Sequence, residues 1–377
     1  MGVKFTIGRT EALEVMSILG RIIPKESVTP ELLHLRAVAD QGRVRLEATD
    51  KVAWVSALLP EEDTDVNEAG AVLIRASKFA DILKVATAAS VAVEETGEDS
   101  EILVSAGFTE YGVKHGGEEG AWPNMEGRIS FGKSLVVKQE DLKKAIDRCL
   151  VATSGAKEHS RFSGSSGVLF ELTNRDITMV ASDSKILVRQ TFPATNDNFD
   201  PTKMKGKVIV PVQSLRVVRE IKAEHVAICV SDKTDAIGFR ASDLTIVSRL
   251  EEGSFPNWKQ IMPRNTKVAT INAEVFRRAL RQSAVLAEDG VVRLEFDGSG
   301  QGKAFAQGPN TGRSSVGFPV VSPIKIAAAF KAEQLLTGIA MFETDADLKF
   351  GFVNADSPIN MTEEDFDFIC VPVINRR

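Results

Sequence analysis

Cysteine is scarce in this chain. The 377 residues include three, Cys149, Cys229 and Cys370, which lie far apart and each in an apolar run such as AICV. An odd number of widely spaced cysteines is not the pattern of a disulfide framework or a zinc knuckle. We therefore predict buried, reduced thiols, as expected of a protein of the cytoplasm.

Long hydrophobic runs and an excess of one charge are also absent. No stretch reaches the ~20 apolar residues of a membrane-spanning helix, and the start, MGVKFTIGRTEALEV, lacks the basic head and apolar run of a signal peptide. The 46 Lys and Arg against 52 Asp and Glu give a net charge of −6. This balance argues against a globally basic nucleic-acid coat protein but allows a local basic surface. With 43% hydrophobic and 26% charged residues, the composition is that of a globular protein of two or three domains.

Catalytic and metal-binding patterns are missing as well. The four histidines show no paired spacing typical of metal ligands, and neither Gly-x-Ser-x-Gly nor His-Glu-x-x-His occurs. We therefore predict no catalytic residue, no metal site and no cofactor.

One motif keeps an enzyme interpretation open. Residues 127–134, GRISFGKS, satisfy the G-x-x-x-x-G-K-S pattern of a phosphate-binding loop, with Lys133 as its lysine. Such a loop follows a buried strand and opens a helix, because the helix N-terminus and the loop amides hold the phosphates. Here the segment follows Trp-Pro-Asn-Met-Glu and precedes Leu-Val-Val, which indicates a strand. A nucleotide-binding protein that uses Gly127–Ser134 is the alternative function, and a β-rich module that binds carbohydrate or protein is a third.

The chain repeats itself. VASDSKILVRQTFP (180–193) is similar to EATDKVAWVSALLP (47–60), and SFPNW (254–258) to AWPNM (121–125), both at an offset of 133 residues. VVKQEDLKKAI (136–146) is similar to TIGRTEALEVM (6–16) and to TINAEVFRRAL (270–280), at offsets of 130 and 134. Several matches in one order indicate three copies of one unit. We predict domains at residues 1–127, 128–263 and 264–377 and call them the first, second and third copy. Asp50 and Asp183, at matching positions, are predicted to hold a turn.

Each copy shows the pattern of an α+β domain. In 138–152 apolar residues recur at helical spacing on one face, and 273–286 repeats the pattern. Further helices are predicted at 9–21, 76–86, 211–222 and 322–334. Alternating or β-branched runs such as GRVRLEA, GVLFELT and DITMVAS indicate strands. Two helices per copy and a majority of antiparallel strands predict helices that cover one face of a sheet.

Charge is unevenly distributed in this pattern. The six predicted helical segments hold 16 Lys and Arg and 9 Asp and Glu, a net charge of +7, which leaves −13 for the rest of the chain. Cationic helix faces on an acidic body fit a surface that meets phosphates. The first segment is neutral and does not contribute to this bias.

These features together resemble one family. Three tandem units, VASDSKIL (180–187), SRLEEGSFPNWKQIMP (248–263) and the C-terminal ICVPV (369–373) are similar, in order and over the whole chain, to the bacterial sliding clamp, the β subunit of DNA polymerase III. The resemblance implies the DNA clamp fold, with a head-to-tail homodimer forming a ring of six domains whose helices face the hole. It implies a non-catalytic, cytoplasmic processivity factor that encircles duplex DNA without reading its sequence. Its partners would be the DNA polymerase III alpha subunit, the clamp loader and repair polymerases, captured through short linear motifs, with no membrane involved.

The resemblance also assigns residues to DNA contact. They are the cations of the predicted helices and of the loop 154–166: Lys78, Lys84, Lys143, Lys144, Arg148, Lys157, Arg161, Arg216, Arg219, Arg277, Arg278, Arg281 and Lys325. A bore lined with such cations would attract phosphates without base contacts, so that the ring can slide.

A hydrophobic pocket for partner peptides is implied between the second and third copies. Its residues would be Ser182, Ser184, Lys185, Ile186, Leu187, Pro256, Gln260, Ile261, Val371, Pro372, Val373 and Ile374. Ser-Lys-Ile follows Asp183 where the family usually has Gly-His-Arg, Gln260 stands where Arg is frequent, and valines flank Pro372 where the family prefers Met. A β-branched rim is stiffer than a methionine rim, so we expect a shifted preference for partner motifs. For the subunit interface, Tyr111 and Val113 match the family's apolar pair, and Val285 and Leu286 match its partners.

Overall fold

The computed structural model describes residues 2–96, 101–117, 119–153, 167–197, 206–321 and 324–374. The chain divides into two compact units. One consists of Met1–Lys143, Thr173–Arg175 and Pro193–Glu251, and the other of Lys144–Leu172, Asp176–Phe192 and Glu252–Arg377. The second copy therefore contributes residues to both units.

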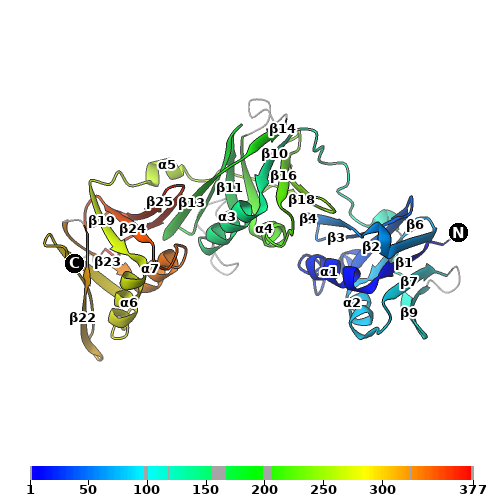
Figure 1. The fold of residues 1–377 in the computed structure, drawn as a ribbon, viewed down its shortest axis with the longest axis horizontal. Helices are drawn as coiled ribbons and strands as arrows, with labels where there is room; N and C mark the ends of the chain where they lie inside the picture. Colours follow the sequence, from blue (N-terminus) through cyan, green and yellow to red (C-terminus); the bar gives the residue numbers. More distant parts are fainter. Residues whose placement is uncertain are drawn as a thin grey trace. The chain divides into compact units, whose positions relative to one another are not determined.

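The order of helices and strands repeats three times along the chain (Figure 1). The first copy contains β1 (Lys4–Gly8), α1 (Arg9–Leu19), β2 (His34–Asp40), β3 (Arg43–Thr49), β4 (Ala53–Leu58), β5 (Thr64–Glu68), β6 (Gly70–Arg75), α2 (Ala76–Val85), β7 (Ser90–Glu95), β8 (Glu101–Ala106) and β9 (Thr109–Lys114). The second contains β10 (Ser134–Lys138), α3 (Gln139–Val151), β11 (Gly167–Leu172), β12 (Asp176–Ser182), β13 (Ile186–Pro193), β14 (Thr195–Asp197), β15 (Lys207–Pro211), α4 (Val212–Val218), β16 (His225–Val230), β17 (Ala236–Ala241) and β18 (Leu244–Arg249).

The third copy follows the short helix α5 (Trp258–Ile261). It contains β19 (Lys267–Asn272), α6 (Ala273–Ala284), β20 (Val291–Asp297), β21 (Gln301–Gly308), β22 (Gly312–Pro319), β23 (Lys325–Lys331), α7 (Ala332–Ile339), β24 (Asp347–Phe352), β25 (Ile359–Glu363) and β26 (Phe366–Cys370). Among the described residues, the third copy has no strand at the place of β5 and β14.

The predicted helices are confirmed in five places and wrong in one. Segments 9–21, 76–86, 138–152, 211–222 and 273–286 contain α1, α2, α3, α4 and α6. The sixth, 322–334, instead contains strand β23, which pairs with β20 along its whole length, and α7 begins only at Ala332. The run IAAAF has high intrinsic helix propensity, but pairing with a neighbouring strand overrides it.

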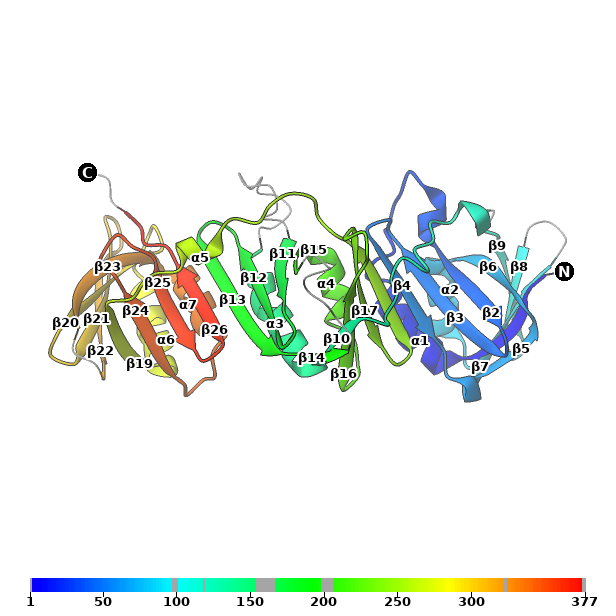
Figure 2. The same cartoon turned by 90° about the horizontal axis from the view of Figure 1, so that it is seen from above.

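Strand pairing joins the copies within each unit. In the first unit one sheet has the order β14-β10-β16-β17-β18-β4-β3-β2-β6, so that β4 of the first copy pairs with β18 of the second. In the second unit strands pair in the order β11-β12-β13-β26-β25-β24-β19, so that β13 of the second copy pairs with β26 of the third (Figure 2). The remaining sheets have the orders β5-β1-β7-β8-β9 and β22-β21-β20-β23.

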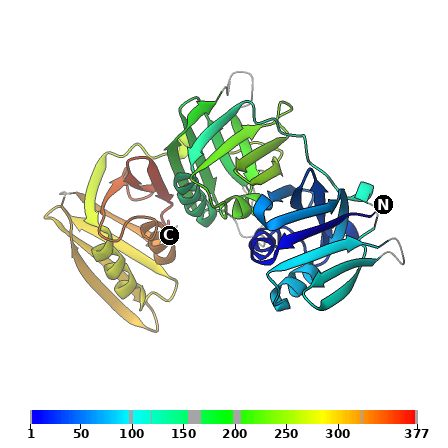
Figure 3. The same ribbon diagram turned by 45° about the vertical axis from the view of Figure 1, so that its right-hand side comes forward.

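Apolar helix faces close the cores of these sheets. Helices α1 and α2 pack on each other in the first copy, as do α6 and α7 in the third (Figure 3). The ring of Phe276 on α6 lies 5.3 Å, centroid to centroid, from both Phe318 and Phe350. All three rings are buried, and each such ring stabilises the fold by roughly 2–3 kcal/mol through the apolar area removed from water. The prediction of an α+β fold with helices on sheets is confirmed.

The same turn follows β3 and β12. Asp50 accepts hydrogen bonds through Oδ1 from the amides of Val52 and Ala53, at 2.9 and 2.7 Å. Asp183 accepts the equivalent pair from Lys185 and Ile186, both at 2.8 Å. The predicted turn role of the two aspartates is confirmed.

Candidate functional site

A cavity of about 950 Å³ lies at one end of the β13–β26 strand pair. Lys185, Val371 and Val373 line it together with one side of α7 and the segment around Asp289. The amide of Val371 donates to the Lys185 carbonyl at 3.0 Å, and that of Val373 to the Ala329 carbonyl at 2.7 Å. Backbone hydrogen bonds therefore fix the C-terminal segment as an apolar rim of the cavity.

The predicted peptide-pocket residues are only partly brought together here. Lys185, Val371, Pro372 and Val373 line the cavity. Ile186 and Leu187 are buried beneath it as part of the strand pair, whereas Ile374 is 56% exposed. The other predicted residues do not line the cavity, and they are Ser182, Ser184, Pro256, Gln260 and Ile261.

The helix α7 side of the cavity was missed by sequence reasoning. Lys331, Gln334, Leu336 and Thr337 line it, but the predicted helix there was placed one strand too early. The repeat carried the only signal that could have corrected this, because α7 stands where α2 and α4 stand in the other copies.

The segment around α5 is anchored to the second copy. Trp258 is buried, and its indole Nε1 donates to Glu171 Oε1 at 3.2 Å. Lys259 pairs with the same carboxylate at 3.4 Å. Ile261, at the end of α5, is 41% exposed, so an apolar side chain faces solvent beside a fixed anchor.

Most of the predicted DNA-contacting cations are exposed. On α6, Arg278 and Arg281 are exposed, whereas Arg277 is mostly covered and pairs with Glu274 at 2.9 Å. The other exposed cations are Lys78, Lys84, Lys143, Lys144 and Arg216 on helices and Lys325 at the start of β23. Arg219 is half-buried. Lys157 and Arg161 lie outside the described residues.

The observed helix bounds reduce the predicted charge segregation. The six helices that correspond to the predicted segments hold ten Lys and Arg and eight Asp and Glu, so that the predicted excess of +7 falls to +2. The excess is concentrated on α6, and α2 and α4 each contribute one further net positive charge. The cationic character therefore belongs to particular helices and not to all of them.

Among the predicted cations that the structure describes, Arg148 is the one that is buried. It is 6% exposed, and its guanidinium donates to Gln190 Oε1 and, at 2.9 Å, to the carbonyl of Met341. It also pairs with Glu363 at 3.4 Å and lies 3.8 Å from the centroid of the Phe366 ring. Because these groups enclose it, Arg148 does not belong to the exposed cationic surface.

Two strands, one in the first copy and one in the third, are the last strands of their sheets. They are β9, which carries half-buried Tyr111 and buried Val113, and β22. A mostly apolar cavity of about 630 Å³ lies between β9 and α2. Directly after α6, which packs on β22, Val285 is 77% exposed and Leu286 half-buried.

The motif at 127–134 does not form a phosphate-binding loop. The segment leads into strand β10, whose first residue is Ser134, and the next helix begins only at Gln139. The cavity of about 550 Å³ beside it is lined by three cations and three carboxylates, and two of those carboxylates already pair with arginines. The structure therefore gives the nucleotide-binding alternative no support.

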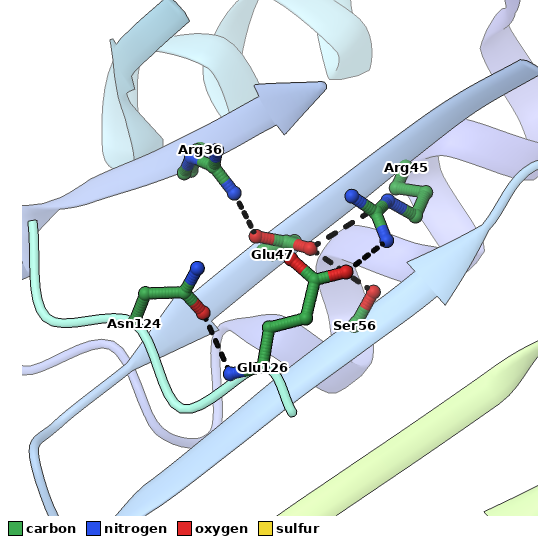
Figure 4. Close-up of polar contacts among 6 residues, drawn as sticks. All are labelled: Arg36, Arg45, Glu47, Ser56, Asn124 and Glu126. Carbon is green, nitrogen blue, oxygen red and sulfur yellow. Dashed lines mark hydrogen bonds and ion pairs between the residues drawn. The ribbon is translucent and has the colours of Figure 1, made fainter. Parts of the chain in front are cut away.

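A polar network around Glu47 contacts the end of the linker segment 122–126, which precedes this motif (Figure 4). Glu47 is fully buried and accepts from Arg36 at 2.9 Å, while Arg45 donates to Glu126 at 2.7 Å. Burial raises the pKa of Glu47, against the opposing effect of Arg36 and Arg45. The hydrogen bond from Arg45 lowers the pKa of Glu126.

The thiols are free and buried, as predicted. Burial raises the pKa of Cys229 to about 11 and that of Cys370 to about 12, and it raises the pKa of Cys149 further still. Thiolates are therefore scarce at neutral pH, and these cysteines are poor nucleophiles. Within the ranges that the structure describes, no cluster of His, Cys, Asp and Glu could hold a metal ion, and no helix is long and apolar enough to cross a membrane.

Known proteins resemble this chain over its whole length. The beta sliding clamp of Streptococcus pneumoniae strain R6 is 22% identical over 389 residues, covering 98% of this chain and 99% of that protein. The solved sliding clamp of Bacillus subtilis has a TM-score of 0.88 at 19% identity and covers 100% of both chains. The Pseudomonas aeruginosa clamp, solved with bound griselimycin, has a TM-score of 0.86 at 20% identity and covers 99% of this chain and 100% of its own. The fold is therefore that of the sliding clamps.

Family models match two of the three predicted copies. Residues 3–116 match the N-terminal domain of the DNA polymerase III beta subunit, and residues 136–257 match its central domain. These matches, in the order of the repeat, together span more than half of the chain. The chain thus belongs to the DNA polymerase III beta subunit family, the bacterial beta sliding clamps.

Proposed function

We propose that this chain is a DNA sliding clamp that closes around duplex DNA as a head-to-tail homodimer and tethers polymerases to it. It is a non-catalytic processivity subunit of the DNA polymerase III holoenzyme, as a member of this family. The observation that carries the proposal is a matched pair of open sheet edges, β9 and β22.

The repeat defines what these two edges would pair with. The first copy uses β4 to pair with β18, and the second uses its equivalent, β13, to pair with β26. By order in the repeat, β22 is the third copy's equivalent of β4 and β13, and β9 is the first copy's equivalent of β18 and β26. Each edge would find its missing partner on a second molecule. Two such head-to-tail contacts close a ring and leave neither β9 nor β22 as an open edge.

Side chains near the two edges support the same pairing. The cavity beside β9 is mostly apolar and includes the predicted interface residues Tyr111 and Val113 in its lining. Val285, exposed near β22, is an apolar side chain of a size that such a cavity accepts. We propose that Val285 and Leu286 of one molecule enter the cavity of the other, because exposed apolar surface of this kind favours association.

Exposed cations on the helices would meet the phosphate backbone. Arg278 and Arg281 on α6 form the strongest group, and Lys78, Lys84 and Arg216 extend it to α2 and α4. Lysine and arginine bind phosphates regardless of base sequence, and the contacts weaken with salt, which suits a ring that is retained by encirclement. The exposed set also includes Lys143, Lys144 and Lys325. We propose the same phosphate contact for Lys157, Arg161 and Arg219.

We further propose three domains, with boundaries near residues 127 and 263. The family matches at 3–116 and 136–257 fall inside the first two. Partner peptides would bind at the cavity beside β26, and the polymerase III alpha subunit, the clamp loader and repair polymerases are the partners proposed for it. Griselimycin binds the Pseudomonas aeruginosa relative and is proposed to bind this chain as well. The proposed location is the cytoplasm.

Light scattering after size exclusion tests ring formation. The expected mass is about twice the 40.9 kDa of the chain, and replacing Val285 with Asp should yield monomers because a charge would enter an apolar contact. Replacing Val321 with Asp, at another exposed valine, is the matched control and should leave the dimer intact. A wild-type chain that stays monomeric at micromolar concentration would refute the homodimer.

Retention on DNA tests encirclement separately. A closed ring loaded on nicked circular DNA should stay bound at high salt and be lost when the circle is linearised. Reversal of Arg278 and Arg281 to Glu should reduce loading, whereas Arg293→Glu, an exposed arginine on β20, should not. Equal loss from circular and linear DNA would show that the chain binds without encircling.

A further inference from the structure

Arg148 links the second copy to the third through buried contacts. It lies on α3, the same helix that exposes Lys143 and Lys144, but its own side chain is enclosed. Its partners come from β13, from the residues after α7, from the end of β25 and from the start of β26. One side chain of the second copy thus holds three segments of the third.

These partners support the walls of the peptide cavity. Gln190 and Phe366 face each other in the β13–β26 pair. The other end of this pair, Ile186 opposite Cys370, leads directly into Lys185 and Val371 at the cavity rim. The pair spans four residue steps, roughly 13 Å of strand, between Arg148 and the rim.

The same guanidinium also fixes the end of α7. Met341, whose carbonyl accepts from Arg148 at 2.9 Å, follows α7 by two residues, and Ala340 between them lines the cavity. The planar guanidinium presents several N–H donors in a fixed fork, so it holds its acceptors in one relative geometry in a way that a single amine does not. Without it, the side-chain oxygen of Gln190, which is buried, would lose its donor.

We propose that Arg148 is a positioning residue for peptide capture: it holds α7 and the β13–β26 pair in register, so that the two walls of the cavity keep the spacing that a partner peptide needs. This inference rests on the proposed peptide-binding function. Under this proposal Arg148 has a different role from the cations proposed to contact DNA. The spacing of the cavity walls then depends on a contact with α3 of the second copy.

Binding of fluorescently labelled griselimycin, and of a peptide from the polymerase III alpha subunit of the same organism, tests this role. We expect the Kd to rise at least about tenfold in Arg148→Gln, since charge-assisted hydrogen bonds that fix the walls are lost. Arg148→Lys should bind with intermediate affinity, because the amine keeps its charge near the Phe366 ring but cannot serve all acceptors. Arg293→Gln, on β20 and outside the cavity lining, should bind as the wild type does.

A second control separates positioning from general stability. Arg189→Gln breaks the neighbouring ion pair with Asp367 on the same strands without touching α7. It should lower the midpoint of thermal unfolding but weaken peptide binding less than Arg148→Gln does. An equal loss of affinity in the two variants would overturn the positioning role, as would wild-type affinity in folded Arg148→Gln.

Failure of the proposed function is distinguishable from failure of this inference. If the wild-type chain binds neither probe, peptide capture itself is wrong. If Arg148→Gln does not fold, Arg148→Lys decides the matter, and wild-type affinity in that variant would overturn the inference.

Discussion

The strand pair β4–β18, between the first and second copies, and the pair β13–β26, between the second and third, occupy the same place in the repeat but carry different side chains. Where Ser56 faces Thr245 in the first pair, Arg189 faces Asp367 in the second. Arg189 donates to Asp367, which is 5% exposed. We call these two strand pairs the first and the second junction. At matching positions the facing side chains are small and neutral in the first junction and charged in the second.

The helices beside the two strand pairs differ in the same way: the helix beside β13–β26 carries a buried charge where the helix beside β4–β18 carries an apolar residue. Counted from the helix starts, Arg148 on α3 corresponds to Ile18 on α1, which is half-buried. Ion pairs between the first and second copies lie at the surface instead, as in Arg21–Glu220 and Lys222–Glu14. Exposed pairs of this kind contribute about 1 kcal/mol at most, whereas breaking a buried pair costs about 3–5 kcal/mol. Removing one charged side chain should therefore cost more stability at the junction β13–β26 than at the junction β4–β18.

Each junction also has a linker that is fixed at both ends. Trp122 and Glu126 contact the first copy, and the ring of Phe131 lies 4.0 Å beneath the Arg240 guanidinium of the second. In the later linker Trp258 contacts Glu171 of the second copy, and Thr266 donates through its amide to Phe352 of the third. The Pro-Asn segments that mark the repeat therefore belong to the linkers between consecutive copies.

The largest expected effect is at the second junction. Asp367→Ala removes the acceptor of both Arg189 and Asn360 and leaves their donors in a buried setting. We expect a loss of about 3 kcal/mol in the free energy of unfolding, measured from the urea midpoint of the second unit's transition. Thr245→Ala, at the matching place in the first junction, should cost less than about 0.5 kcal/mol. Similar losses for the two variants would mean that the junctions do not differ as their side chains suggest.

A smaller effect is expected from pH at the first linker. Burial raises the pKa of Glu47 above the usual 4.5, so its neutral form favours the fold; that contribution is present below pH 4.5 and is lost as the pH rises through its folded pKa. Glu126 behaves oppositely, because Arg45 lowers its pKa: its contribution is present above pH 4.5 and is lost as the pH falls through its folded pKa. Glu126 is partly exposed, which weakens its contribution.

Two substitutions separate these opposite dependences. Glu47→Gln should flatten the fall of stability on the alkaline side of pH 4.5, and Glu126→Gln should flatten the fall on the acid side. Thermal unfolding midpoints measured from pH 3 to pH 8 give both slopes. The same flattening in both variants would show that the two carboxyls titrate as one group.

Much of the fold follows from local patterns. The spacing in α3 and α6 and the alternation in β3 and β12 depend on which side of an element is buried, and neighbouring residues record this directly. The helix prediction for 322–334 was wrong because local propensity in an alanine-rich run favours a helix, and pairing of β23 with β20 overrides it. The turn that Asp50 and Asp183 share could be predicted from the repeat, because its hydrogen bonds join residues only three positions apart.

Parts of the candidate site lie beyond such patterns. Arg148 follows Lys143 and Lys144 on the helix and carries the same charge, so the sequence groups the three together. Its burial depends on Met341, Glu363 and Phe366, about 200 residues away in the chain, and no local spacing records that contact. The cavity wall formed by α7 was missed because the helix was predicted at 322–334, a segment that mostly forms β23, and α7 follows that strand.

The smallest expected effect compares the two equivalent turns. Lys51 and Ser184 have φ values of 74° and 73°, in the left-handed region that costs a residue with a Cβ about 1 kcal/mol. Ser184→Gly should therefore raise the free energy of unfolding by about 0.5 kcal/mol, after part of the gain is offset by the greater freedom of glycine in the unfolded chain. Lys51→Gly should gain less, because the lysine amine also donates to Thr29 Oγ1 at 2.9 Å. Ser184→Ala keeps the Cβ and should gain nothing in urea unfolding; if alanine stabilised as much as glycine, backbone strain would not be the cause, and the two turns would differ only in their side-chain contacts.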